Sequence, residues 1–218
     1  MFALRDPLLI LYIAVALLLS LSIHEASHAA VADFLGDPGP RKAGRLTLNP
    51  IAHLDPAGAL VLVISSLAGF GIGWGKPVPV SPWKLQRGFL KNLPNGPLVG
   101  MGIVALAGPV SNLILAAFGV HILANLPLPA SAMDNWLRFV ETWVFVNVVL
   151  AIFNMIPIPP LDGSRVLMAL LPTNLGYRFA RLEGVGPGLL ILLVFLLPGV
   201  LDTILSTASE PLLRIIGA

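Results

Sequence analysis

The chain has 218 residues, of which 56% are apolar and 11% are charged, and its formal net charge is +2. Soluble globular chains carry about 25% charged residues, so this composition excludes a soluble enzyme or a disordered chain and predicts an integral membrane protein. Because the sequence has no Cys, thiolate metal sites, thiol nucleophiles and disulfide scaffolds are also excluded. The positive charge is too small and too dispersed to indicate nucleic-acid binding.

Four apolar stretches have the length of a membrane-spanning helix, about 20 residues, and a fifth is weaker. In chain order they are 8–35, the weaker 57–70, 98–126, 136–158 and 188–205, the last with Pro198 as an expected kink. We therefore expect an all-α polytopic membrane protein with about four to five transmembrane helices. At this length, residues 1–218 should form a single domain.

The N-terminal 30 residues allow a second interpretation as a signal peptide. Arg5 is followed by an apolar run from Leu8 to Leu21 and by small residues at Ala29 and Ala30. The remaining chain is itself strongly apolar, so cleavage would release no soluble protein. We therefore favour a membrane helix.

The sequence from His24 to His28 is H-E-x-x-H, and it lies inside the first apolar stretch. On a helix this spacing places both imidazoles on one face, where they can hold one metal ion, and it places Glu25 beside them to act on a metal-bound water. Ionisable groups are costly at membrane depth, so three of them in five residues indicate a functional site. The alternative is an amphipathic surface helix with scattered polar residues.

A catalytic zinc site commonly has three protein ligands and a water, so a third ligand is needed. Asp162 is the best candidate, because it follows a segment whose prolines at 157, 159 and 160 must unwind the fourth apolar stretch. Unwound backbone at membrane depth is tolerated where protein or a water-filled cavity surrounds it, so this carboxylate should face a cavity. Alternatively, Asp162 caps the helix expected over 163–171. His53 and His121 are weaker candidates, each isolated from other ligands.

Residues 107–112 read Ala-Gly-Pro-Val-Ser-Asn. The small residues allow close helix packing, and Asn112 can hydrogen-bond to a neighbouring helix. For this patch we favour a packing role.

Taken together, H-E-x-x-H in an early apolar stretch, a G-P-x-x-x-N-like patch and N-x-x-P-x-x-x-L-D-G resemble the site-2 proteases, which are intramembrane zinc metalloproteases. The resemblance covers about residues 8–170, and the stretch 44–56 is similar to a short prokaryotic branch without PDZ or CBS domains. It implies one Zn²⁺ per chain held by His24, His28 and Asp162, with Glu25 as general base. It further implies that Asn154 helps to hold the substrate carbonyl or the oxyanion, and that the substrate is a transmembrane protein.

A shared metal site requires His28 and Asp162 at one depth, so the first and fourth apolar stretches must run parallel. An odd number of crossings must then separate them, and we expect a re-entrant or hairpin element at 57–80 instead of a further span. Under this topology ten of the 13 Lys and Arg lie on one side, which the positive-inside rule assigns to the cytoplasm. The sequence thus predicts a prokaryotic cell-membrane protein whose active site lies toward the cytoplasm.

Two other functions stay open at this point. A metal-ion transporter would use the His and Asp cluster as an ion path, yet the other apolar stretches hold few ionisable groups. A catalytically inactive membrane scaffold is the second alternative, although every predicted acid, base and metal ligand is present. Two imidazoles and a carboxylate without sulfur favour zinc among divalent ions.

Overall fold

The computed structural model describes residues 6–55 and 75–217. Within these residues the regular secondary structure is helical, apart from one isolated antiparallel β-bridge between Leu54 and Gly75. The predicted all-α polytopic class is therefore confirmed.

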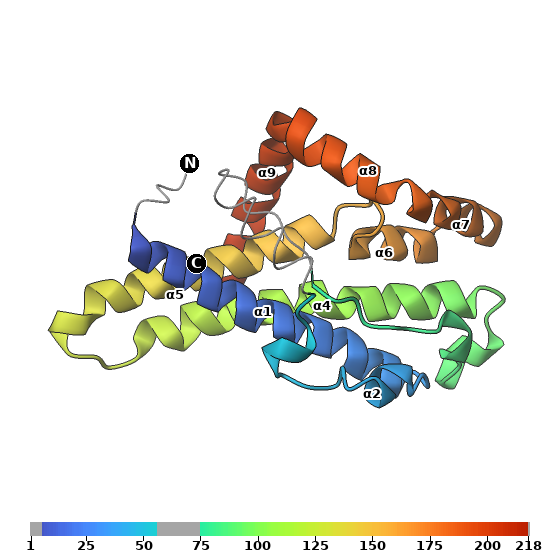
Figure 1. Ribbon diagram of the computed structural model, residues 1–218, viewed down its shortest axis with the longest axis horizontal. Helices are drawn as coiled ribbons and strands as arrows, with labels where there is room; N and C mark the ends of the chain where they lie inside the picture. Colours follow the sequence, from blue (N-terminus) through green and yellow to red (C-terminus); the bar gives the residue numbers. More distant parts are fainter. Residues whose placement is uncertain (1–5, 56–74, 218) are drawn as a thin grey trace.

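Three long helices form the body of the molecule (Figure 1). They are α1 (Pro7–Phe34), α4 (Gly96–His121) and α5 (Ala130–Asn154), and each is long and apolar enough to cross a membrane. Asp6 starts α1, because its side chain accepts a hydrogen bond from the Leu8 backbone N–H at 3.0 Å. In Figure 1, α1 and α5 run in the same direction and α4 runs in the opposite direction, which confirms the parallel arrangement expected for a shared metal site.

Helix α4 is the central packing element, since it contacts α1, α5 and the shorter helix α6 (Asp162–Leu170). Its buried glycines allow these close approaches: an added Cβ at Gly102 would lie 2.5 Å from the Ala169 methyl of α6. On its other side, Trp143 of α5 donates its indole N–H to the Leu115 carbonyl of α4 at 2.7 Å.

The C-terminal part differs from the sequence prediction. The chain continues through α7 (Thr173–Ala180), a 3₁₀ turn (Arg181–Gly184), α8 (Gly186–Ile191), a π-helical turn (Leu192–Leu196) and α9 (Pro198–Ile216). The single helix expected over 188–205 is wrong, but the chain does break at Pro198, where a kink was predicted. Pro198 cannot donate a backbone hydrogen bond, and the chain breaks at Leu197, with φ −126° and ψ 47°.

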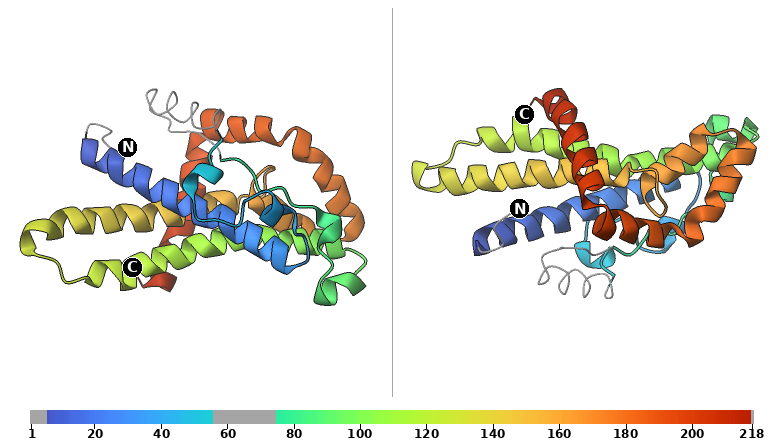
Figure 2. Two further views of the ribbon diagram at one scale, coloured as in Figure 1. Left: turned by 60° about the horizontal axis from the view of Figure 1, so that its bottom comes forward. Right: turned by 90° about the horizontal axis from the view of Figure 1, so that it is seen from above.

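As a result, α9 leaves the line of α8 and crosses α5, where it packs (Figure 2). The apolar pair Thr173–Gly184 and Gly186–Leu196, bent by 73°, is the remaining candidate for a span. The described residues thus hold three candidate spans, or four if this bent pair counts as one, so the predicted number of four to five is met only at its lower bound.

The loops after α1 lie together on one side of the bundle. The buried carboxylate of Asp37 accepts hydrogen bonds from the backbone N–H of Gly39 at 2.9 Å and of Ser81 at 2.6 Å. The Lys76 N–H donates to the His53 carbonyl at 2.8 Å, beside the bridge between Leu54 and Gly75. Most of the expected hairpin at 57–80 lies outside the described residues, and its described part, 75–80, has no helical turn.

Candidate metal centre

Helix α1 runs without interruption through the H-E-x-x-H motif. One helical turn separates His24 and His28, so both side chains point toward α4, and their ring centroids lie 4.6 Å apart in an edge-to-face arrangement. Both residues are buried. The helix thereby presents two imidazoles side by side in the interior of an apolar bundle.

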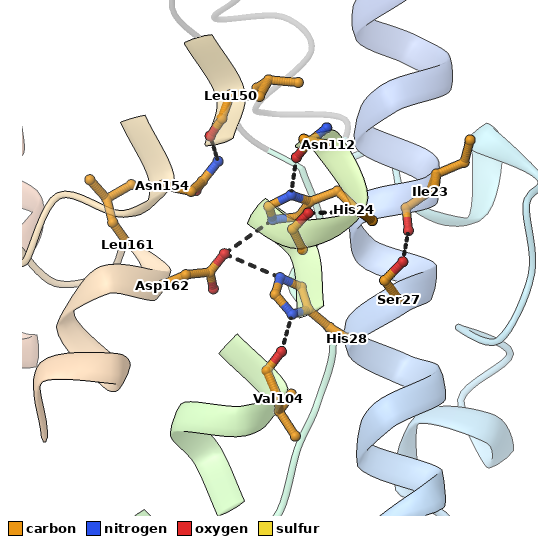
Figure 3. A network of polar contacts seen from close by, with 12 residues as sticks. Ile23, His24, Ser27, His28, Val104, Asn112, Leu150, Asn154, Leu161 and Asp162 are labelled. Atoms are coloured by element: carbon orange, nitrogen blue, oxygen red, sulfur yellow. Dashed lines mark hydrogen bonds and ion pairs between the residues drawn. The ribbon is translucent and has the colours of Figure 1, made fainter. Parts of the chain in front are cut away.

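Asp162 reaches these rings from the opposite side. Helix α5 ends at Asn154, and the Pro-rich chain after it is not helical until α6 begins at Asp162. One oxygen of Asp162, Oδ2, lies 3.1 Å from Nε2 of His24 and 3.3 Å from Nε2 of His28 (Figure 3). No side-chain hydrogen bond caps α6, so the alternative role of Asp162 as a helix cap is not seen.

The other nitrogen of each ring meets a separate acceptor. Nδ1 of His28 donates to the Val104 carbonyl at 2.7 Å, and Nδ1 of His24 lies 2.6 Å from Oδ1 of Asn112. With its proton on Nδ1, a neutral imidazole keeps a lone pair on Nε2, which is the form that binds metal ions.

Three electron-pair donors therefore face one another, all within 4.8 Å: the Nε2 atoms of His24 and His28 and a carboxylate oxygen of Asp162. Such a set needs a cation or protons between its members, because acceptors alone repel. Two imidazoles and one carboxylate are a donor set that Zn²⁺ accepts. The residues present thus fit a zinc ion.

Gly108 of α4 keeps the space beside these atoms open. A Cβ at this position would lie 2.4 Å from Nε2 of His24 and 2.6 Å from Nε2 of His28, closer than real Cβ contacts. The helix backbone therefore forms one wall of the site, and a glycine is required there for the rings to occupy their positions.

The structure does not join every predicted site residue to this cluster. Glu25 is half-buried and follows His24 directly on α1, but it is not part of the group that could hold a metal ion. The side-chain amide of Asn154 donates to the Leu150 carbonyl of its own helix at 3.0 Å. His53 donates from Nε2 to the Thr47 carbonyl at 2.8 Å, and His121 is exposed at the far end of α4.

The expectation of a packing role for Asn112 is incomplete. Its side chain does bond to a neighbouring helix, since Nδ2 donates to Oδ1 of Asn147 on α5 at 3.0 Å, but its oxygen also contacts His24. Sequence reasoning missed Val104, Gly108 and Asn147 as residues near the cluster. Gly108 lies in the Gly-Pro patch that was singled out, whereas a single Asn147 in an apolar stretch gives no pattern to read.

Comparison with known proteins identifies the family of the chain. The model of "Peptidase family M50" matches residues 120–197, which include the end of α5 and Asp162. A Bacillus subtilis protein named "Putative zinc metalloprotease YwhC" is 35% identical over 215 residues, covering 95% of this chain and 91% of the relative. The chain belongs to peptidase family M50. The predicted resemblance to the site-2 proteases is thereby confirmed.

Other curated relatives match a smaller part of this chain. "Putative zinc metalloprotease Rip2" of Mycolicibacterium smegmatis is 33% identical over 153 residues, which are 69% of this chain and 53% of the relative. "Putative zinc metalloprotease MJ0611" of Methanocaldococcus jannaschii is 44% identical over 66 residues, which are 30% of this chain and 32% of the relative. No solved structure matches the chain. Family membership and a His–His–Asp cluster both support the predicted zinc cofactor.

Proposed function

We propose that this M50 chain hydrolyses peptide bonds in or near the transmembrane segments of membrane proteins, with one zinc ion held by His24, His28 and Asp162. One observation carries the proposal: H-E-x-x-H on α1 and the carboxylate after the unwound end of α5 converge within 3.3 Å inside a bundle of apolar helices. The family is one of metalloproteases, and the position of the cluster among candidate membrane spans supports cleavage at membrane depth.

When bound, zinc supplies a Lewis acid that polarises the scissile carbonyl and activates a water at neutral pH. Glu25 is the proposed group for proton transfer, and its position next to the proposed ligand His24 on α1 supports this role. Its carboxylate takes a proton from the attacking water and passes it to the leaving amine. The carboxamide of Gln has nearly the same shape as this carboxylate but cannot take up and release the proton.

Asn154 is the proposed group that holds the substrate carbonyl. It is the last residue of α5, where the helix gives way to the Pro-rich chain that leads to Asp162. Its amide nitrogen bonds to Leu150 within its own helix, and a substrate carbonyl would have to compete with that bond. Amide donors of this kind stabilise charge that develops on a carbonyl oxygen.

The substrate must present an unwound strand to this site. Peptide bonds within a membrane helix are hydrogen-bonded internally, so local unwinding precedes cleavage, and helix-breaking residues in the substrate reduce its cost. The distribution of Lys and Arg supports an active site toward the cytoplasm of a prokaryotic cell membrane.

The test uses the detergent-purified chain with a panel of single-span proteins that carry Gly or Pro in the membrane segment. We expect about one zinc per chain and cleavage by the native protein. Glu25→Gln should keep zinc and lose cleavage, and Asp162→Ala should lose zinc and cleavage together. Zinc at full stoichiometry in Asp162→Ala would refute the proposed ligand set.

The same preparations separate the two other functions. Zinc flux into liposomes that persists in Glu25→Gln, without cleavage in the native protein, would favour a metal transporter. A zinc-loaded native protein that neither cleaves nor transports would favour a scaffold.

A further inference from the structure

Two asparagines lie fully buried in the apolar bundle, Asn112 on α4 and Asn147 on α5. A buried amide that finds no partner costs about 1–3 kcal/mol, so their placement calls for an account of every donor and acceptor. The proposed chemistry uses neither side chain. The neighbours of Asn147 along α5, Val146 and Val148, are buried hydrophobic residues.

The two amides form one chain of hydrogen bonds that ends at the metal centre. Nδ2 of Asn147 donates to the Trp143 carbonyl at 2.9 Å, Nδ2 of Asn112 donates to Oδ1 of Asn147 at 3.0 Å, and Oδ1 of Asn112 lies 2.6 Å from Nδ1 of His24. Figure 3 shows the last of these contacts. The chain therefore links α5 to α4 and α4 to α1.

The Trp143 carbonyl, at the end of the series away from His24, determines which atom donates in each hydrogen bond. The Trp143 carbonyl can only accept, so the nitrogen of Asn147 must face it and the oxygen of Asn147 must face Asn112. Asn112 then turns its own nitrogen toward Asn147 and its oxygen toward His24. Nδ1 of His24 must in turn donate, which leaves the lone pair of the neutral ring on Nε2.

His28 reaches the same state by a shorter route. Its Nδ1 donates directly to the Val104 carbonyl, which can only accept. Asn112 differs from a carbonyl, since an amide that rotates by half a turn presents a donor in place of an acceptor. On its own, Asn112 could stabilise either tautomer of His24, and one of the two places a proton on the nitrogen that faces Asp162.

We propose that Asn147 is a positioning residue of the metal centre: acting through Asn112, it holds His24 in the tautomer whose Nε2 lone pair faces Asp162. This inference rests on the proposed zinc site. Outer partners of metal-binding histidines commonly change metal affinity by about 10–100-fold when they are replaced. A loss in this range is expected when residue 147 can no longer accept a hydrogen bond.

Two substitutions of similar size give opposite predictions. Asn147→Leu fills the volume with an apolar group but offers no acceptor, so Asn112 is free to turn. Asn147→Asp keeps an acceptor oxygen toward Asn112 and preserves its orientation, because the buried carboxyl group is protonated and its O–H donates to the Trp143 carbonyl in place of the amide. If residue 147 served only to pack the bundle, Leu would be tolerated and a buried acid would be the more harmful change.

Zinc affinity is measured on the purified full chain by competition with a chromophoric chelator. We expect a loss of about 10–100-fold for Asn147→Leu and a value close to that of the native protein for Asn147→Asp. Thr142→Val is the matched control, since Thr142 is buried on the same helix and its hydroxyl donates to the Arg138 carbonyl one turn earlier, not to the series of amides. Its zinc affinity should be unchanged.

A second measurement reads the tautomer without metal or activity. Histidine is labelled with ¹⁵N, zinc is removed with a chelator, and the protonated nitrogen of each ring is identified by NMR at a pH where both rings are neutral. His24 should be protonated on Nδ1 in the native protein and in Asn147→Asp, and should lose this preference in Asn147→Leu. His28 is the internal control and should keep Nδ1–H throughout.

The two measurements distinguish a failure of this inference from a failure of the proposed function. A native His24 protonated on Nε2, or equal zinc affinities and identical His24 spectra for the native protein and Asn147→Leu, would overturn the inference. Even if Asn147→Leu does not fold, the spectrum of the native protein shows which tautomer His24 adopts and so tests the inference. A native protein that has the expected tautomer but binds no zinc would instead overturn the proposed function.

Discussion

Replacing Gly108 with Ala tests the metal centre by adding one methyl group. The new Cβ would lie 2.4 Å from Nε2 of His24 and 2.6 Å from Nε2 of His28, where ordinary contacts begin at 3.4 Å. Both rings must therefore retreat by about 1 Å, because α4 is packed against α1, α5 and α6 and cannot withdraw. Metal–ligand distances tolerate only about ±0.2 Å, so we expect zinc affinity to fall by more than about 100-fold.

The fold itself should withstand this change. Ala is favoured over Gly in a helix interior by about 1 kcal/mol, and this gain offsets part of the roughly 1–3 kcal/mol that overpacking costs. The assay is zinc affinity by chelator competition, together with thermal unfolding of the zinc-free protein in detergent. Gly100→Ala is the control, since its Cβ would meet Leu85 at 2.8 Å and no imidazole. Wild-type zinc affinity in Gly108→Ala would refute the reasoning.

Three further predictions concern topology, loop structure and metal removal. In this Cys-free chain, single cysteines at Leu46 and Lys84 should both react with an impermeant reagent from the cytoplasmic side, and labelling from opposite faces would exclude a hairpin between them. Asp37→Ala should lower the free energy of unfolding by about 1–3 kcal/mol, because two backbone N–H groups lose their acceptor. Asp33→Asn, which removes an exposed ion pair with Arg41, should lower the unfolding temperature by less, and equal shifts for the two variants would contradict this. Zinc at 100 times its Kd should stabilise the chelator-treated protein by about 2.7 kcal/mol, seen as a higher unfolding temperature, and should leave Asp162→Ala unchanged.

The long helices could be predicted from the sequence because each depends on a local property. The first apolar stretch, 8–35, becomes Pro7–Phe34, since an apolar run of this length has one stable form in a membrane. The unwinding after Asn154 was equally predictable, because the prolines that follow it cannot continue a helix. The path of α9 was not, because Pro198 marks a break but does not determine the direction of the chain after it.

The residues of the candidate site also differ in whether a local sequence pattern marks them. The sequence singled out His24, His28 and Asp162 because two short patterns with known chemistry mark them, and in the structure the Asp162 carboxylate lies within 3.3 Å of both imidazoles. Gly108 and Asn147 were not found, since their importance depends on which helix lies opposite. A glycine or an asparagine in an apolar stretch has the same local appearance whether it faces lipid, a neighbouring helix or a metal centre.

Four polar side chains inside this bundle form one connected series. From the Trp143 carbonyl, hydrogen bonds run through Asn147 and Asn112 to His24, and the Nε2 atom of that ring faces Asp162. Each link leaves the next group with its lone pair directed toward the cluster, so the series ends in an acceptor that only a cation or a proton can satisfy. Because the surroundings are apolar, a polar group left without a hydrogen bond costs free energy at each of these residues. This cost favours one orientation for each side chain of the series.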